Sequence, residues 1–257
     1  MSADMPTTIL ITGATGGIGG ALALAYAAAQ RTLVLHGRNS QRLSQLANEC
    51  RDAGATVFTA CFDLADTARL RDWLIEMDAQ CRLDLVIANA GMNINMGPNN
   101  SGEQWDAVQA LLQVNVIAAM ATLHAVLPAM RARKSGQIAL ISSLAAWRGL
   151  PETPSYSASK AAVKAYGEAM RDAVAADGVK INVVMPGYVH SQMAYDMPGP
   201  KPFMWPAAKA AKVIKRGLAR NSARISFPFP LNFGCWLLAG IHPAVSGWIL
   251  RRLNYGH

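Results

Sequence analysis

The alternation of short apolar runs with longer amphipathic stretches constrains the fold of this chain more than any other sequence feature. Six apolar runs predict strands at residues 8–12, 32–36, 56–60, 83–88, 137–142 and 180–185. Runs that alternate with helical patterns are typical of βαβ units, which build a parallel sheet with helices on both faces. Because each run is almost continuously apolar, we expect its strand to be covered on both sides. The sequence therefore predicts a doubly wound α/β fold.

Helices are predicted between these runs and after them. They start at residue 21 and at Ala207, and cover residues 40–53, 67–79, 103–133 and 155–176, with a break near Val114. Four prolines between residues 195 and 206 exclude a regular helix there and predict a loop or lid. Around it lie Met193, Met197, Met204 and Trp205, which fit either a lid over an apolar substrate or ordinary packing.

The composition is that of a folded globular protein. The chain has 257 residues, of which 52% are apolar and 16% charged, whereas disordered chains are poor in apolar residues and rich in charge. The sequence contains neither an internal repeat nor a low-complexity linker. We therefore expect residues 1–257 to form one domain. Residues 7–195 would be its core, and residues 196–257 a lid and a basic, apolar C-terminal extension.

The net charge of +8 is concentrated near one end of the sequence. Residues 1–196 carry 15 basic and 16 acidic side chains, whereas residues 197–257 carry nine basic and no acidic ones. Because the excess charge is confined to one segment, a uniformly basic nucleic-acid-binding protein is disfavoured. We expect no nucleic-acid partner.

Neither the cysteines nor the histidines have the spacing of a metal site. The four cysteines form no CxxC or Cys/His pattern, and the five histidines are scattered. Lone cysteines at this density indicate reduced thiols. The first residues, MSADMPTT, lack the basic and apolar regions of a secretory signal. We expect a cytoplasmic protein without a metal.

A glycine-rich segment, TGATGGIG at Thr12–Gly19, joins the first predicted strand to the first predicted helix. Glycines let the backbone approach a pyrophosphate closely, and the free N–H groups of a helix N-terminus attract the same anion. The context therefore predicts a dinucleotide-binding loop. Its candidate cofactor-binding residues are Gly13, Thr15, Gly17, Ile18 and Gly19.

The end of the second strand indicates which dinucleotide binds. An acidic residue there would bind the ribose hydroxyls of NAD, whereas a basic one would accept the 2′-phosphate of NADP. The sequence is His36-Gly37-Arg38-Asn39, and a guanidinium can bind phosphate through two hydrogen bonds. We therefore expect NADP(H) in preference to NAD(H), with Arg38 as the phosphate ligand.

Tyr156 and Lys160 form a Tyr-x3-Lys pair near the start of a predicted helix. This spacing places both side chains on one helix face, where the ammonium can lower the pKa of the phenol from about 10. Tyr156 could then exchange a proton near neutral pH. Ser143, which follows the fifth strand, could hold a substrate oxygen beside the pair.

Taken together, these motifs resemble the short-chain dehydrogenase/reductase family. The family's order and approximate spacing recur in TGATGGIG, Asp63, the ANAG segment at Ala88–Gly91, Asn115, Ser143, YSASK at Tyr156–Lys160 and Pro186-Gly187. The resemblance covers residues 7 to about 195. It implies a single Rossmann-type domain with a seven-stranded parallel sheet, in which residues 223–227 form the seventh strand.

The resemblance also implies roles for four catalytic residues. Tyr156 would be the general acid/base, and Lys160 would lower its pKa and bind the nicotinamide ribose. Ser143 would polarise the carbonyl, and Asn115 would hold a water that relays protons to Lys160. Further cofactor contacts would come from Asp63, Leu64, Asn89, Ala90, Gly91, Pro186, Gly187, Val189 and Ser191. The family more often has Thr where this chain has Ser191, but the hydroxyl is retained.

The segment after the seventh predicted strand leaves two interpretations open. Residues 225–250 contain no Asp, Glu, Lys or Arg, and Arg251 and Arg252 follow them. Eight proline, glycine, asparagine and histidine residues interrupt this stretch, so a single membrane-spanning helix is disfavoured. Residues 207–252 could make a peripheral contact with an anionic membrane at its inner face. Alternatively, they could complete the substrate pocket or a subunit contact.

These observations lead to one main functional hypothesis and one alternative. We expect an NADP(H)-dependent oxidoreductase that acts on the carbonyl or secondary alcohol of an apolar substrate resembling a lipid, a steroid or a long-chain compound. The alternative is a non-catalytic NADP-binding sensor or scaffold at a membrane surface, which would have no need for the Tyr156 and Lys160 pair. The family resemblance also implies a homodimer or homotetramer.

Overall fold

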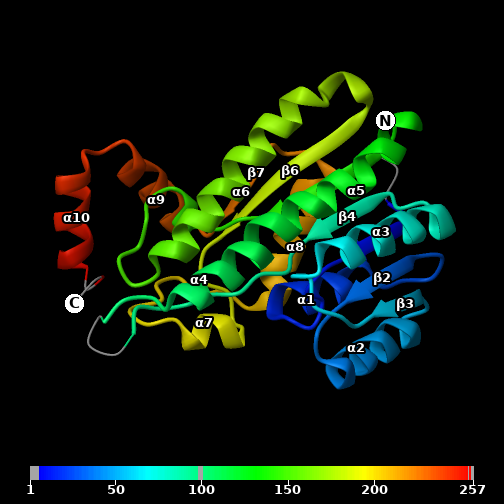
Figure 1. Cartoon of the computed structure of the whole chain (residues 1–257), viewed down its shortest axis with the longest axis horizontal. Helices are drawn as coiled ribbons and strands as arrows, with labels where there is room; N and C mark the ends of the chain where they lie inside the picture. Colours follow the sequence, from blue (N-terminus) through cyan, green and yellow to red (C-terminus); the bar gives the residue numbers. More distant parts are fainter. Residues whose placement is uncertain (1–5, 98–100, 254, 256–257) are drawn as a thin grey trace.

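Seven parallel strands form one sheet in the order β3-β2-β1-β4-β5-β6-β7 (Figure 1). The structure is a computed structural model that describes residues 6–97, 101–253 and 255. The strands are β1 (Thr8–Ile11), β2 (Thr32–His36), β3 (Thr56–Ala60), β4 (Leu85–Ala88), β5 (Gly136–Ile141), β6 (Val179–Pro186) and β7 (Arg224–Phe227). The predicted α/β fold and its seven-stranded parallel sheet are confirmed.

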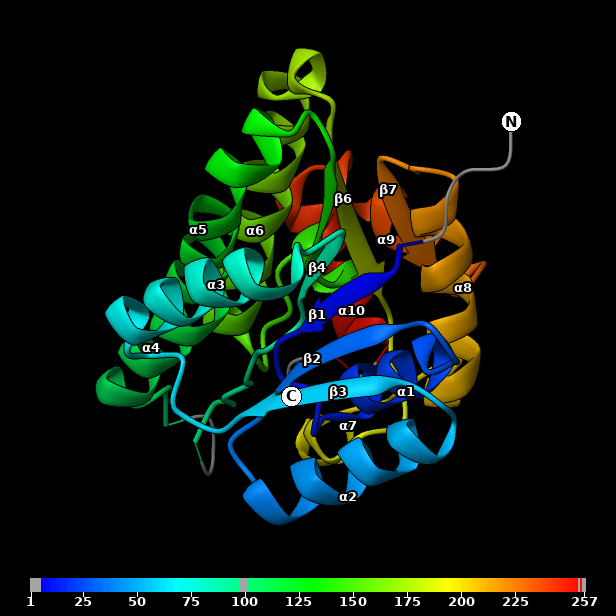
Figure 2. The same ribbon diagram turned by 90° about the vertical axis from the view of Figure 1, so that its right-hand side faces the viewer.

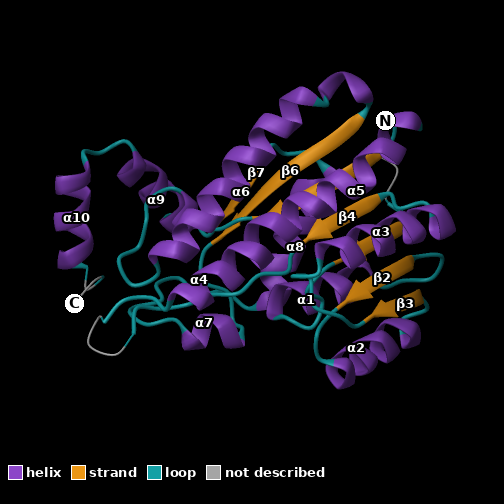
Figure 3. Cartoon of the chain, in the orientation of Figure 1, coloured by secondary structure: helices purple, strands orange, loops and turns teal. Residues whose placement is uncertain are grey.

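Helices cover both faces of the sheet (Figures 2 and 3). One face packs against α1 (Gly17–Tyr26), α2 (Ser40–Asp52) and α8 (Ala207–Ala219). The opposite face packs against α3 (Thr67–Cys81), α5 (Ala118–Ala132) and α6 (Pro154–Ala173). The chain therefore has three layers, with one core on each side of the sheet.

Strand side chains divide between these two cores because successive residues of a strand point to opposite faces. Ile9 and Ile11 of β1 belong to the core under α1, α2 and α8, whereas Leu10 belongs to the other core. All three side chains are fully buried. Burial on both faces explains why the runs are continuously apolar rather than alternating.

The long helical stretch predicted over residues 103–133 is interrupted where the break was expected. It consists of α4 (Trp105–Leu112), one π-helical turn η2 (Gln113–Ile117) and α5. The run Trp105–Ala132 is long and apolar enough to cross a membrane, but most of its apolar part is buried within the protein. It is therefore a core helix, and its π turn carries Asn115. Single π turns inside helices are frequent at functional sites.

Residues beyond β6 form the segment predicted as a lid, called the lid below, and the C-terminal extension. The short helix α7 (Gln192–Asp196) starts the proline-rich loop, and α9 (Leu231–Ala239) and α10 (Pro243–Arg252) extend beyond the sheet (Figure 1). The basic helix α8 is instead part of the sheet covering, and Nζ of Lys215 on it donates to the carbonyl oxygen of Ala25. Two short 3-10 turns, η3 (Leu144–Ala146) and η4 (Ala175–Asp177), complete the helical elements that the structure describes.

Candidate active site

The glycine loop between β1 and α1 packs tightly against the ends of two other strands. Gly13 has a φ of +64°, and a Cβ built on it would lie 2.7 Å from Cα of Ala90, after β4. A Cβ built on Gly17 would lie 2.7 Å from the carbonyl oxygen of His190, after β6. Glycine is therefore required at both positions. The N-cap residue of α1, Gly16, makes no side-chain cap, so the first N–H groups of this helix are left for an anion.

Asn89 holds this loop in place from the end of β4. Its side-chain Nδ2 donates to the carbonyl oxygens of Thr12 and Gly13, at 2.9 and 3.0 Å. Its backbone N–H donates to Oγ1 of Thr12 at 3.0 Å. The predicted contribution of Asn89 to cofactor binding therefore includes shaping the loop, because both hydrogens of its amide are used within the protein.

A cavity of about 900 Å³ lies at the carboxyl ends of the strands. Ligands of open parallel sheets bind in this position, where strands run out and loops meet. Every predicted cofactor-binding residue lines the cavity: Gly13, Thr15, Gly17, Ile18, Gly19, Arg38, Asp63, Leu64, Asn89, Ala90, Gly91, Tyr156, Lys160, Pro186, Gly187, Val189 and Ser191. The structure thus assembles in one place a set of residues that spans 179 positions of the sequence, from 13 to 191.

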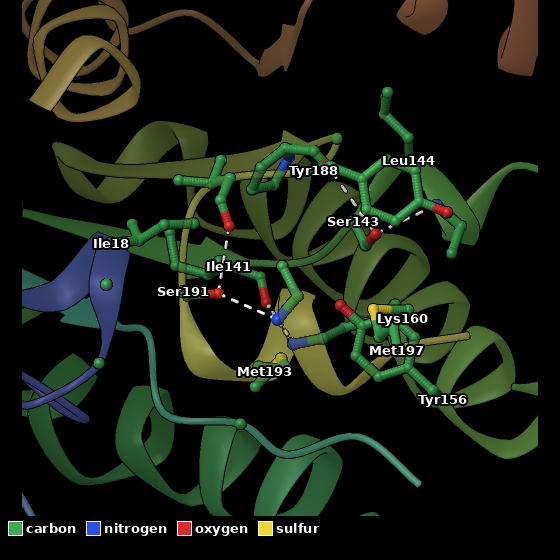
Figure 4. A pocket seen from close by; sticks show the side chains of 18 of the residues that line it. Ile18, Ile141, Ser143, Leu144, Tyr156, Lys160, Tyr188, Ser191, Met193 and Met197 are labelled. Carbon is green, nitrogen blue, oxygen red and sulfur yellow. Dashed lines mark hydrogen bonds between the residues drawn. The ribbon is translucent and has the colours of Figure 1, made fainter. Parts of the chain in front are cut away.

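Tyr156 and Lys160 lie side by side in the first two turns of α6 (Figure 4). Their side chains are buried, with exposed fractions of 8% and 4%. Nζ of Lys160 lies 5.6 Å from the centre of the Tyr156 ring and donates to the carbonyl oxygen of Ile141 at 3.0 Å. The end of β5 therefore fixes the ammonium beside the phenol.

Burial governs the acid–base properties of this pair. Desolvation raises the pKa of Tyr156, and a side-chain hydrogen bond with Ser143 opposes it. Desolvation also lowers the pKa of Lys160 to about 8. The expected lowering of the phenol pKa by Lys160 is not found, because desolvation dominates and the group that opposes it is Ser143. Burial moves the two pKa values in opposite directions.

Ser143 and Asn115 are the other two predicted catalytic residues. Oγ of Ser143 accepts a hydrogen bond from the N–H of Ala145 at 3.2 Å, and it lines the cavity. Asn115 is the one predicted catalytic residue that does not line the cavity. Its Nδ2 donates to the carbonyl oxygen of Met92 at 2.9 Å and to Oγ of Ser159 at 3.0 Å.

Gly91 shows how close Asn115 is to Lys160. A Cβ built on Gly91 would lie 3.2 Å from Oδ1 of Asn115 and 3.3 Å from Nζ of Lys160. Gly91 thus lies between the Asn115 amide and the Lys160 ammonium. Asn115 therefore lies behind the cavity wall, next to Lys160, which lines the cavity.

A cluster of polar side chains lines the part of the cavity beyond the glycine loop. Arg38 and Arg42 both line this end, and Asn39 caps α2 by accepting from the N–H of Arg42 at 2.9 Å. Oδ1 of Asp63 accepts from the N–H of Ala65 at 2.9 Å. Sequence reasoning identified Arg38 and missed Arg42, although an arginine four residues later on a helix that starts at residue 40 was an available signal.

Apolar side chains from the lid and the C-terminal helices wall the other end of the cavity. They are Met193, Met197, Leu231, Cys235, Leu238 and Leu250. Trp205 has a different environment, because its ring stacks on that of Phe227 with 5.2 Å between centroids.

The hydroxyl of Tyr255 donates to the carbonyl oxygen of Pro200 at 2.9 Å and thereby joins residues after α10 to the lid. Residues of the C-terminal segment therefore line the cavity, and their role in binding a substrate stays a prediction.

A glycine loop after β1, a Tyr/Lys pair after β5 and a cavity across the strand ends define a nicotinamide-dependent oxidoreductase. A family model described as short chain dehydrogenase matches residues 7–199. The chain belongs to this family.

Comparison with individual proteins agrees with this assignment. An uncharacterized oxidoreductase of Myxococcus xanthus is 36% identical over 226 residues, which cover 87% of this chain and 88% of that protein. The ketoacyl reductase HetN of Nostoc sp. is 36% identical over 183 residues, which cover 71% of this chain and 63% of that protein. A short-chain dehydrogenase from Sphingobium yanoikuyae in complex with NADPH superposes with a TM-score of 0.80 at 25% identity, covering 94% of each chain.

Proposed function

We propose that this protein is an NADP(H)-dependent oxidoreductase that acts on the carbonyl or secondary alcohol of an apolar substrate resembling a lipid, a steroid or a long-chain compound. The observation that carries the proposal is the meeting of Tyr156, Lys160 and Ser143 in one cavity whose far end is apolar. The similarity to a ketoacyl reductase and to a structure holding NADPH supports it. In this proposal, residues 7–195 hold the cofactor and carry the chemistry, and residues 196–257 admit the substrate.

The chain's own groups suit proton transfer to a carbonyl oxygen. A bound nicotinamide would supply or accept the hydride. Tyr156 would donate its hydroxyl proton to the oxygen, and Ser143 would donate a hydrogen bond to the same atom. The Lys160 ammonium would stabilise the phenolate that results and hold the nicotinamide ribose. Asn115, behind Gly91, would hold the water through which Lys160 exchanges protons with solvent.

The complete set of four groups favours catalysis over the alternative of a binding-only sensor or scaffold. The experiment that distinguishes them follows the loss of NADPH absorbance with a panel of ketones graded by chain length, with and without lipid vesicles. We expect turnover that increases with apolar length. Tight NADPH binding without turnover of any carbonyl would instead favour the sensor.

The preference for NADP(H) rests on two arginines at the polar end of the cavity. Arg38 and Arg42 both line it, and the second strand ends without a carboxylate. We expect Arg38→Ala to raise the Kd of NADPH about 10- to 100-fold, because a hydrogen bond to a charged group contributes about 1.5–3 kcal/mol. The Kd of NADH should stay nearly constant. Both constants can be measured by titration of the bound dinucleotide's fluorescence.

Arg71→Ala is a matched control for this prediction, because Arg71 is exposed on α3, on the opposite side of the sheet from α2. It should leave both dissociation constants unchanged. Equal losses of NADPH and NADH affinity in Arg38→Ala would show that Arg38 does not recognise the 2′-phosphate.

We also propose that the protein is cytoplasmic and that it makes a peripheral contact with an anionic membrane, within residues 207–252. The supporting observation is an aromatic surface on the C-terminal helices, where Phe233, Trp236 and Trp248 are each more than half exposed. The exposed Arg251 and Arg252 adjoin it, and basic side chains beside aromatic ones suit an anionic interface. A homodimer or homotetramer, the assembly proposed from the family, would use the outer faces of the long helices, where Ile117 is exposed.

Sedimentation with vesicles tests this contact. The unmodified chain should sediment with phosphatidylglycerol vesicles and much less with phosphatidylcholine vesicles. The double variant Trp236→Ser, Trp248→Ser should lose most of this binding, because the apolar side chains that enter the interface are removed. Trp105→Ser is the control, since Trp105 is 68% exposed but lies on α4. Equal partitioning of both variants would contradict a contact through α9 and α10.

A further inference from the structure

Helix α9 forms one wall of the cavity, and this wall is a single helix thick. Leu231, Gly234, Cys235 and Leu238 line the cavity, and this spacing of three, four and seven residues defines one helix face. On the other side, Phe233, Trp236 and Leu237 are exposed by 54%, 51% and 50%. All nine residues of α9 are described and none of them is buried. The inner face of this helix therefore limits how far a substrate can extend.

Gly234 is the smallest residue on this inner face, and the fold does not require glycine there. Its φ is not positive, unlike that of Gly13. A Cβ built on Gly234 would have no atom within 4 Å, whereas one built on Gly17 would collide with the backbone. Glycine also forms helices poorly. The missing side chain gives the cavity room and serves no backbone purpose.

The surroundings of this room suit an uncharged aliphatic chain. Leu238, Leu250 and Met197 contribute apolar side chains to the same end of the cavity. The nearby Arg148 uses its Nε to donate to Oγ of Ser246 and its Nη1 to donate to the carbonyl oxygen of Gly149, both at 2.9 Å. Arg148 also lines the cavity, but two of its three guanidinium nitrogens are bonded to α10 and to its own loop, so most of the contact offered to a ligand here is apolar.

We propose that Gly234 sets the length limit for the alkyl or acyl chain of the substrate, and that linear long-chain carbonyl compounds are the substrate class. This rests on the proposed function, since it takes the carbonyl to lie at Tyr156 with the chain directed towards α9. Each substrate methylene that fits between Tyr156 and α9 is transferred from water into the cavity and adds to the binding energy. The gain stops when the substrate chain is long enough to reach the inner face of α9.

The test compares the wild type with Gly234→Phe on linear methyl ketones that differ by one methylene. In the wild type, kcat/KM should rise about fourfold per methylene, which corresponds to about 0.8 kcal/mol per buried CH₂, until the chain reaches α9. In Gly234→Phe the rise should stop several methylenes earlier. Short ketones should keep their kcat/KM, and the KM for NADPH should not change.

Two matched variants separate the cavity from effects on the helix. Gly234→Ala adds one methyl group to the same room and strengthens the helix, so it should shorten the length limit far less than Gly234→Phe does. Ala239→Phe adds the same ring to the same helix at an exposed position that does not line the cavity, and it should leave the profile unchanged. A length profile that is identical in Gly234→Phe and the wild type would overturn the proposal.

A second readout is independent of turnover. Linear alkanols of increasing length should raise the Tm of the NADPH-bound protein up to a limiting length, and Gly234→Phe should shorten that limit. If no ketone is reduced but the alkanol limit still shifts, the proposed function fails while the role of Gly234 holds. An unshifted alkanol limit contradicts the role of Gly234 whatever the activity.

Discussion

Replacing Tyr156 with phenylalanine should lower kcat by about 10²- to 10⁴-fold, the usual contribution of a positioned general acid. The ring would still fill its buried place at the start of α6, where 8% of the side chain is exposed. Because only the proton donor is removed, the Kd of NADPH should stay within the error of the wild-type value. Stopped-flow measurement of a single turnover, together with a fluorescence titration, checks both expectations.

Tyr166→Phe provides the control on the same helix. The hydroxyl of Tyr166 is buried without a hydrogen-bond partner among the described residues, and its ring lies 6.3 Å from that of His124. Its removal should leave kcat unchanged. If Tyr156→Phe kept a large share of the wild-type rate, another group would have to be the proton donor.

Replacing Lys160 with methionine should abolish most activity and yet make the protein more stable. Turnover should fall at least about 100-fold, because the buried ammonium next to the phenol is lost. Methionine fills a similar volume without the desolvated charge. The pKa of Lys160 falls from 10.5 to about 8, and at about 1.4 kcal/mol per unit this difference sets an upper limit of roughly 3 kcal/mol on the gain. The lost hydrogen bond to Ile141 reduces that gain.

The pH dependence of this gain identifies its source. Between pH 8 and pH 10.5 the unfolded chain binds the lysine proton and the folded chain does not, so the wild type becomes more stable as pH rises. The stability advantage of Lys160→Met should therefore be full below about pH 8 and disappear towards pH 10.5. Thermal unfolding of both proteins across this range measures it. A constant difference would show that packing, and not charge burial, is responsible.

The sheet was predictable because burial on both faces leaves a direct trace in the sequence. In β1, for example, Ile9, Leu10 and Ile11 are all apolar, because successive side chains enter opposite cores. The four proposed catalytic residues were identifiable because short motifs mark them. The break near Val114 was also visible, although the sequence pattern did not show that it takes the form of a π turn.

Features that depend on contacts between distant segments were not predictable. Nothing near Gly234 or Tyr255 in the sequence indicates that both face the same cavity as Gly13. The direction of the Tyr156 pKa was missed for the same reason, because spacing shows which charges are near but not how much water is excluded. Asn89 was assigned a cofactor contact, and its bonds to the glycine loop became apparent only when β1 and β4 were side by side.

The C-terminal helices are attached to the rest of the protein at a few places, including the hydrogen bonds from Arg148 to Ser246 and from Tyr255 to Pro200. Leu231 and Cys235 of α9 also pack against Val183 and Met185 of β6, and neither of the two hydrogen bonds involves the glycine loop. We therefore expect mutations in α9 beyond Leu231 and in α10 to affect the proposed substrate binding more than the binding of the dinucleotide. In evolutionary terms, the proposed division of roles would let the substrate range change while the redox chemistry is kept.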